Sequence, residues 1–197
     1  INDPKGILSS PEKILIFNFP ELIPETIITR SKIEVIKFLK NFSSAVIKPL
    51  YGNGGEGVFF INKNDLNLNQ IIDTFLSTSK EAFMVQKYLP EIINGDKRII
   101  LVDGEPVGAI SRIPKKNEIR SNIHVGGTAK KALISKSDQV ICDLIGPELR
   151  KRKLFFVGID IIGHHLTEIN VTSPTCLREI KKLSKIDIAK IIWDKLS

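Results

Sequence analysis

The sequence LFFVGIDIIGHHLTEINV, residues 154–171, decides the fold because it holds two apolar runs separated by a glycine-containing turn. Runs rich in branched and aromatic residues on either side of such a turn predict a β-hairpin. We expect its strands at residues 154–162 and 166–171. The turn between them would hold three residues, Gly163, His164 and His165.

This turn length sets a register that pairs Ile162 with Leu166, Ile161 with Thr167 and Asp160 with Glu168. Paired residues share a sheet face, and Asn170 lies two positions further along that face. Like charges placed opposite each other destabilise a hairpin, and a divalent cation would remove this conflict. Oxygen ligands in small number suit Mg²⁺. The alternative is a solvated edge with unpaired acids.

A second hairpin and several helices indicate the fold class. Asp103-Gly104 is a strong turn signal between strands expected at 98–102 and 107–110. Helices mixed with antiparallel hairpins, without strand–helix alternation, predict an α+β fold. The other expected elements are strands at 45–48, 58–61 and 83–87, and helices at about 32–40, 67–77 and 137–151. Capping residues are expected in Ser31–Glu34, in Ser135–Asp138 and, before a final helix, in Ser184–Asp187.

A glycine-rich loop, GNGGEG at residues 52–57, lies between two of these strands. Glycines let backbone N–H groups approach a phosphate closely, although the loop is no Walker A motif because no Gly-Lys-Ser/Thr follows. An ordinary hairpin loop is the alternative. Lys48 favours the phosphate interpretation, because a lysine on an apolar strand is costly unless its ammonium meets an anion.

Three arginines form another candidate group: Arg98, Arg112 and Arg120. Their planar guanidinium groups suit carboxylates and phosphates, although most arginines simply face solvent. Arg120 falls in the polar segment 113–127, which is longer than most connections and is therefore expected to be a mobile lid.

Composition narrows the class of protein. The 197 residues are 42% hydrophobic and 26% charged, as in soluble globular proteins, and no apolar run approaches the ~18 residues of a membrane helix. The net charge of +7 allows a nucleic-acid partner, but no aromatic residues interleave with the basic clusters. We therefore expect neither nucleic-acid nor membrane binding. Two cysteines without metal spacing fit a reducing cytoplasm.

Several stretches together resemble the prokaryotic glutathione synthetases, a family of ATP-grasp ligases. The similarity runs nearly end to end and is densest from 84 to 180. The stretches that carry it are FVGIDIIG (156–163), LTEINVTSPT (166–175), IKPLYGNGG (47–55), QKYLP (86–90), GDKR (95–98), RIP (112–114), RSN (120–122) and GG (126–127). The sequence differs from the family's pattern at Glu56, where a small residue is expected, and at Thr128, where a basic residue is common.

The resemblance implies an ATP-grasp fold of two lobes, each with an antiparallel sheet flanked by helices, and ATP in the cleft between them. It places a small lobe at 30–91 and a C-terminal lobe with the metal site at 92–197. The family has a further N-terminal domain of roughly a hundred residues or more. Residues 1–29 are expected to be its tail and a linker.

The resemblance also implies roles for individual residues. Catalytic roles fall to Arg112 and Arg120. Substrate contacts fall to Arg98, Ser173 and Thr175. The Mg²⁺ ligands, with Mn²⁺ as a possible substitute, are Asp160, Glu168 and Asn170. ATP contacts fall to Lys32, Lys48, Gly52, Gly54, Gly55, Gln86, Lys87, Tyr88, Leu89 and Asp96.

The activity implied is ATP-dependent ligation of glycine to the cysteine carboxylate of γ-glutamylcysteine through an acyl phosphate, giving glutathione, ADP and phosphate. Asp160→Asn or Lys48→Ala in the full-length protein is then expected to cut turnover by orders of magnitude and to leave the fold intact. A homo-oligomer is expected for the full-length protein. The alternatives are another ATP-grasp ligase, a module that binds ATP without catalysis, and a basic nucleic-acid binder.

Overall fold

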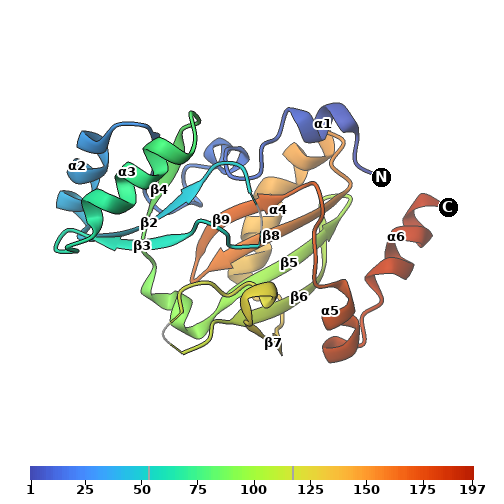
Figure 1. The fold of residues 1–197 in the computed structure, drawn as a ribbon. Coiled ribbons are helices and arrows are strands. Elements are labelled where there is room, and N and C mark those ends of the chain that lie inside the picture. The colour runs from blue at the N-terminus through green and yellow to red at the C-terminus, as the bar shows by residue number, and fades with distance from the viewer. Residues whose placement is uncertain (53, 117) are drawn as a thin grey trace. The chain divides into compact units, whose positions relative to one another are not determined.

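The computed structural model describes residues 1–197 except Asn53, Asn117 and the side chain of His124 (Figure 1). The chain forms two compact units, which are described separately. Unit 1 consists of residues 1–23 and 91–197, and unit 2 consists of residues 24–90.

Unit 2 is a four-stranded antiparallel sheet with two helices, and its strand order is β1-β4-β2-β3 (Figure 1). Its elements are β1 (Thr26–Thr29), α2 (Lys32–Phe42), β2 (Ser44–Pro49), β3 (Phe59–Asn62), α3 (Leu68–Thr78) and β4 (Phe83–Lys87). Both helices cover one face of the sheet, because Val35 of α2 and Ile72 of α3 share a hydrophobic cluster with Ile47 and Val85. Strand residues alternate between faces, so Lys48 and Gln86 lie on the other face.

The cap of α2 is only half of the expected capping box. The Ser31 hydroxyl accepts the backbone N–H of Glu34, as expected. The Glu34 carboxylate does not return to Ser31; it accepts the hydroxyl of Thr29, whose oxygen in turn accepts the Ser31 N–H at 2.8 Å. The Ser31 N–H is therefore bound by the Thr29 hydroxyl instead of by the Glu34 carboxylate that the sequence pattern predicted.

Unit 1 is built on a five-stranded antiparallel sheet with the order β7-β6-β5-β8-β9 (Figure 1). Its strands are β5 (Asp96–Val102), β6 (Glu105–Ile113), β7 (Thr128–Lys131), β8 (Phe156–Ile162) and β9 (His165–Asn170). Its α-helices are α1 (Pro4–Leu8), α4 (Lys136–Lys151), α5 (Leu177–Ser184) and α6 (Ile188–Leu196), with 3-10 turns at η1 (Leu15–Asn18), η2 (Pro90–Asn94) and η3 (Ile123–Val125). The two antiparallel sheets with helices confirm the predicted α+β class.

Helices α5 and α6 cover part of one face of this sheet. Ile180 and Ile188 from these helices pack in one hydrophobic cluster with Ile100 and Ile110 from β5 and β6. Arg98 lies two residues before Ile100, so alternation places it on the same face, beyond the apolar cluster. The face is therefore apolar at one end and charged at the other.

The turn of the β8–β9 hairpin is shorter than predicted. Ile162 pairs with His165, so the turn holds two residues, Gly163 and His164, instead of three. Gly163 adopts a φ of +60°, a left-handed conformation that two-residue hairpin turns require and that glycine adopts without strain. The predicted pairing of Ile162 with Leu166 is therefore wrong.

A β-bulge then restores the predicted register. The pairing shifts between Asp160 and Ile161, which leaves Thr167 as the extra residue on β9. The Thr167 hydroxyl donates a hydrogen bond of 3.1 Å to the Asp160 carbonyl oxygen. Asp160 consequently lies opposite Glu168, as predicted. Two differences of one residue each, in the turn and at the bulge, cancel.

The caps of the later helices differ in how well the sequence predicted them. Ser135 and Asp138 form the expected capping box of α4. Ser184, expected to cap the final helix, instead ends α5, because Lys185 adopts a left-handed φ of +63°. The cap of α6 is Asp187, whose carboxylate accepts the Lys190 N–H at 3.3 Å.

The N-terminal segment pairs with the outer edge of β9. The Glu12 carbonyl accepts the N–H of Ile169 at 3.3 Å, and the Leu22 carbonyl accepts the N–H of Leu166 at 2.8 Å. The Glu12 carboxylate accepts the N–H groups of Val171 and Thr172, which follow β9, at 2.8 and 2.9 Å. Residues 12–22 thus satisfy backbone donors that an edge strand would leave unpaired.

Candidate functional site

The charged end of the unit 1 sheet is a buried ionic cluster centred on Asp160, which is 4% exposed. Its carboxylate accepts hydrogen bonds from Arg98 Nε at 2.5 Å and Nη2 at 2.8 Å. Arg112 Nη2 lies 3.0 Å from Asp160 Oδ2, the oxygen that also accepts from Arg98 Nη2. Arg112 also binds Asp96 through two hydrogen bonds, of which that from Nε to Oδ1 measures 2.8 Å. Acids and arginines therefore alternate through the cluster.

Strand register assembles this cluster. Asp96 is the cross-strand partner of Arg112, and Arg98 is the partner of Asp160. Directly paired residues point to the same face, where opposite charges attract. Gly158 leaves the space that the arginine needs, because a Cβ there would lie 3.1 Å from Arg98 Cδ.

The pKa values of the two acids are shifted in opposite directions. Burial alone would raise the pKa of Asp160, but the charges of Arg112 and Arg98 outweigh it and hold that pKa well below its usual range. Burial leaves the pKa of Asp96 raised in spite of Arg112, and the nearby Asp160 charge adds to the rise. Asp160 is therefore the firmly ionised carboxylate of the cluster.

The predicted metal ligands lie on one face of β8 and β9. Asn170 Nδ2 is 3.4 Å from Asp160 Oδ2 and 3.2 Å from the Gly158 carbonyl oxygen, to which it donates. Glu168, opposite Asp160, forms an ion pair with Lys13, whose Nζ lies 3.1 Å from Glu168 Oε1. The structure thus brings all three predicted ligands to one region.

Lys13 was not among the residues predicted from the sequence. Its side chain is 8% exposed and belongs to the N-terminal segment, which was interpreted as a linker. A signal was present, because Lys13 precedes the apolar run Ile14-Leu15-Ile16. Like Lys48, Lys13 adjoins apolar residues, and a buried ammonium is costly unless it meets an anion.

The donor set fits a hard divalent cation, but the electrostatic reason given for one needs correction. Two carboxylates and an amide supply the oxygen ligands that Mg²⁺ prefers. The repulsion between Asp160 and Glu168, however, is already compensated by arginines on one side and by Lys13 on the other. Among the described residues, no group of three or more His, Cys, Asp or Glu side chains is arranged to hold a metal ion. A cation bound here has to displace partners of these ion pairs or lie beside them.

The predicted substrate residues connect to the cluster through one contact. Arg98 Nη1 donates a hydrogen bond of 3.4 Å to Thr175 Oγ1. Thr175 and Ser173 are both exposed in the segment between β9 and α5. Arg98 therefore binds buried Asp160 through Nε and Nη2 and the exposed hydroxyl of Thr175 through Nη1.

Arg120 makes a local contact instead of joining the cluster. Its guanidinium lies 2.7 Å from Glu118 Oε2, and this hydrogen bond lowers the pKa of Glu118 to about 2. The neighbouring Ser121 is buried and hydrogen-bonds to Asp96. The described part of the predicted lid, 113–127 without Asn117, is thus tied at Ser121 to the ionic cluster.

The predicted nucleotide residues of unit 2 centre on Lys48 and Gln86. Lys48, which is 9% exposed, donates from Nζ to Gln86 Oε1 at 3.1 Å. Gln86 Nε2 in turn donates to the Thr26 hydroxyl at 3.0 Å. Both side chains lie on the sheet face opposite the two helices, so the polar groups line up across β1, β4 and β2.

The remaining predicted residues of this unit have separate partners. Lys32, the first residue of α2, pairs with Asp73 at 2.9 Å. Lys87 pairs with Glu25 at 3.0 Å. The Tyr88 ring packs edge-on against Phe60 with centroids 4.8 Å apart, and Leu89 is buried.

The glycine loop has the backbone that its sequence requires. Gly52, Gly54, Gly55 and Gly57 have φ values of +138°, +67°, +83° and +67°. A side chain at Gly57 would also lie 3.2 Å from the Pro49 ring. The predicted loop residue Asn53 lies outside the described residues.

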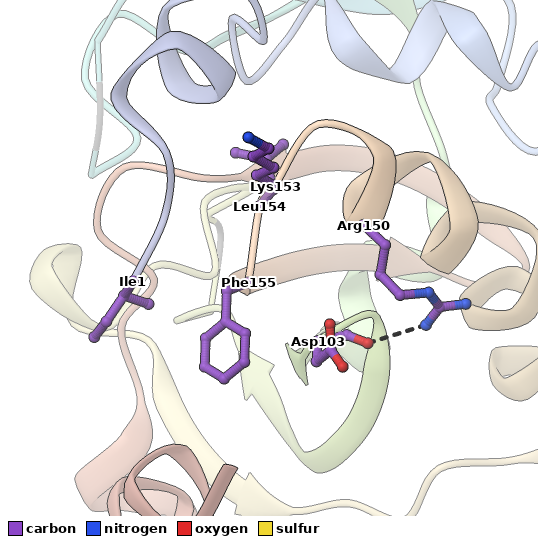
Figure 2. A pocket seen from close by; sticks show the side chains of 6 residues that line it. All are labelled: Ile1, Asp103, Arg150, Lys153, Leu154 and Phe155. Atoms are coloured by element: carbon purple, nitrogen blue, oxygen red, sulfur yellow. Dashed lines mark hydrogen bonds between the residues drawn. The ribbon is translucent and has the colours of Figure 1, made fainter. Parts of the chain in front are cut away.

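An open pocket of about 280 Å³ lies elsewhere in unit 1 (Figure 2). It is lined by Ile1, Asp103, Arg150, Lys153, Leu154 and Phe155, and Arg150 donates to the Asp103 carbonyl oxygen at 3.0 Å. None of the predicted site residues lines this pocket. Among the described residues, no helix has the length and apolar character to cross a membrane.

The matching family model and the curated relatives point to the same family. Residues 12–185 match the family described as prokaryotic glutathione synthetase, ATP-grasp domain. The chain is 48% identical over 194 residues to a glutathione synthetase from Mesorhizobium japonicum and 46% identical over 196 residues to one from Agrobacterium fabrum. These matches cover 98% and 100% of the chain but only 62% and 61% of the relatives, so the chain spans about three fifths of their length.

Solved structures identify the fold. The ATP-grasp ligase PsnB, in complex with a minimal precursor, Mg and ADP, superposes with a TM-score of 0.71 at 16% identity, over 99% of this chain and 60% of PsnB. At that identity the likeness shows the fold alone, which is the ATP-grasp fold. From the match over residues 12–185 and the identity to both relatives, the chain belongs to the prokaryotic glutathione synthetase ATP-grasp family.

Proposed function

We propose that this chain is the ATP-grasp part of an enzyme that ligates glycine to the cysteine carboxylate of γ-glutamylcysteine, giving glutathione, ADP and phosphate. The observation that carries the proposal is 48% identity, over 98% of the chain, to a relative named glutathione synthetase. The buried ionic cluster on β5, β6 and β8 supports it, because polar groups held at such cost in a sheet interior indicate a functional site.

The proposed metal is Mg²⁺, with Mn²⁺ as a substitute, and its ligands are Asp160, Glu168 and Asn170. When bound, such a cation neutralises charge on a transferring phosphoryl group. Two observations support this assignment: the donor set suits a hard cation, and PsnB, which shares the fold, was solved with Mg and ADP.

The proposed ATP-binding residues lie in unit 2 and at the start of β5. Lys48, Lys32 and the glycines at 52, 54 and 55 would contact phosphates, as charged donors and as backbone donors. The segment 86–89 would hold the adenine. Asp96, bound to Arg112, would act on the nucleotide through that arginine.

The proposed reaction has two steps. In the first, a carboxylate oxygen of the peptide attacks the γ-phosphorus, the bond to the bridging oxygen of ADP breaks, and ADP leaves. In the second, the glycine amine attacks the acyl carbon, phosphate leaves, and the amine loses a proton. Arg112 and Arg120 would stabilise the oxyanion of the second step, and Arg98, Ser173 and Thr175 would hold the peptide.

Water has to be excluded between these steps, because an acyl phosphate hydrolyses readily. We assign this role to residues 113–127 as a lid. The proposal also includes a homo-oligomer of the full-length protein and a cytoplasmic location, which the two buried cysteines without a disulfide support.

The test uses Lys48→Met in the full-length protein, with Lys63→Met, an exposed lysine just after β3, as the matched control. Phosphate release that depends on both γ-glutamylcysteine and glycine is measured. Lys48→Met is expected to lower turnover by at least about 100-fold, because a preorganised charge on the phosphates is lost, while the control stays unchanged. Equal turnover in both variants would show that Lys48 is not part of the ATP-binding site. Phosphate release with other acids or amines, but not with this pair, would assign the chain to a different ATP-grasp ligase.

A further inference from the structure

Lys13 completes a row of four charged side chains across the sheet. Arg98, Asp160 and Glu168 are successive cross-strand partners on β5, β8 and β9. Lys13 follows Glu168 at the end of this row, with its Nζ 3.1 Å from Oε1. Two cations thus flank two carboxylates that would otherwise repel each other.

The segment that carries Lys13 is held firmly in place. The neighbouring Glu12 accepts the N–H groups of Val171 and Thr172 through its side chain and that of Ile169 through its carbonyl oxygen. The ammonium of Lys13 therefore sits on a fixed backbone, and its position relative to Glu168 does not depend on a flexible tail. Its side chain is 8% exposed, so solvent screens the ion pair only weakly.

We propose that Lys13 is a positioning residue that holds the Glu168 carboxylate beside Asp160 and competes with the metal ion for it. The inference rests on the proposed metal site. A cation that binds Glu168 has to displace the ammonium or sit beside it, and like charges at this distance repel strongly where water is scarce. Lys13 thus weakens binding of the bare metal while it stabilises the metal-free protein.

Removal of the Lys13 charge is expected to lower the stability of the metal-free protein and to raise its affinity for the metal ion. A residue with a purely structural role would lower the stability without raising the affinity. Replacing Lys13 with methionine, an apolar side chain of similar length, leaves Glu168 opposite Asp160 without its counter-ion. The metal-free protein then becomes less stable because the carboxylates repel each other. Binding of a bare divalent cation becomes tighter because the competing charge is gone.

The experiment titrates the full-length protein with Mn²⁺ alone and follows the free ion by electron paramagnetic resonance. Lys13→Met is expected to bind Mn²⁺ about tenfold more tightly than the wild type, as removal of a unit charge close to a dication predicts. Lys13→Arg keeps the charge and is expected to bind like the wild type. Glu12→Ala loosens the same segment but keeps the ammonium, so it is expected to lose stability without gaining affinity.

A further variant keeps the inference distinguishable from the proposed function. Glu168→Gln is expected to weaken Mn²⁺ binding, because one of the proposed carboxylate ligands is lost. If Glu168→Gln binds Mn²⁺ like the wild type, or the wild type binds none, the proposed metal site fails and the inference with it. If Glu168→Gln weakens binding but Lys13→Met binds no more tightly than the wild type, the inference alone is overturned.

Discussion

Individual buried charges dominate unit 1 at the scale of the residue. Asp160 accepts from two arginines, and each of those guanidinium groups is almost completely buried. The charge of Asp160 keeps the pKa of both arginines above the ordinary value, even though burial acts to lower it. Removing the central carboxylate would leave two buried cations without a full counter-charge.

The variant Asp160→Asn is therefore expected to lose about 3–5 kcal/mol of unfolding free energy, the cost of breaking a buried ion pair from one side. Urea unfolding followed by circular dichroism measures this loss. The control is Asp143→Asn on the exposed side of α4. The same unfolding midpoint for both variants would contradict the central position of Asp160. From the sequence alone Asp160 is only a metal ligand, and its replacement is expected to spare the fold; the structure changes that expectation.

Residue types predicted part of this site, and geometry supplied the rest. Alternation placed Glu168 and Asn170 on one face of β9, and the predicted register placed Asp160 opposite Glu168 because the errors in the turn and at the bulge cancelled. The partners of these residues could not be predicted, because Lys13 is 155 positions from Glu168 and only the folded chain brings them together. Arg98 and Arg112 were singled out for the recognition of carboxylates or phosphates, and the carboxylates that they bind in the structure are those of Asp160 and Asp96.

At the scale of the element, the β8–β9 hairpin shows how a correct register arose from two compensating errors. Branched residues on both sides of Gly163 identified the strands. The turn length and the bulge at Thr167 depend on local backbone geometry that composition does not encode. Similarly, Ser184 and Asp187 both suit an N-cap, and only the left-handed backbone at Lys185 decides between them.

The helix α4 offers a test of capping. Ser135 accepts the N–H of Asp138, and Asp138 accepts the N–H of Ser135 at 2.7 Å. Ser135→Ala removes one of these bonds and is expected to lower the unfolding free energy by about 1 kcal/mol. Thermal and urea unfolding measure the change, with Ser135→Thr, which keeps a capping hydroxyl, as the control. A cap that contributes nothing would leave the alanine and threonine variants equally stable.

For the molecule as a whole, charge balance sets the response to acid. The pKa of Asp138 and that of Asp160 are both lowered, because charged partners outweigh burial: Lys97 for Asp138, and Arg112 with Arg98 for Asp160. A lowered pKa means that the stabilisation is complete above the ordinary value of 3.8 and is lost as the pH falls below it. Asp96, with a raised pKa, acts in the opposite direction and offsets part of this loss.

We expect the unfolding free energy to stay nearly constant from pH 7 to about pH 5 and to fall below about pH 4. Asp138→Asn removes one of the contributing carboxylates, so its stability should fall less steeply over the acid range. Urea midpoints measured at intervals between pH 3 and pH 7 test this. A variant curve that runs parallel to the wild-type curve would show that Asp138 is not among the titrating groups.

For the whole molecule, the sequence predicted the fold class but not the place of the N-terminal segment. The mixture of capped helices and hairpins was sufficient for the α+β class, and the family motifs were sufficient for the ATP-grasp fold. The place of residues 1–23 within unit 1 was not predictable, because its prolines hide any periodicity. What fixes this segment is backbone pairing with β9, and backbone atoms are the same in every sequence.

That pairing has a practical consequence for anyone who shortens the protein. A fragment that starts after Leu22 would lose the carbonyl groups now bonded to Leu166 and Ile169. The outer side of β9 would then be exposed to solvent with these N–H groups unpaired. A strand exposed in this way pairs with strands of other molecules, and the protein then aggregates. Expression fragments of this domain should therefore retain the chain from before Glu12, even though that stretch contributes only two short helical turns of its own.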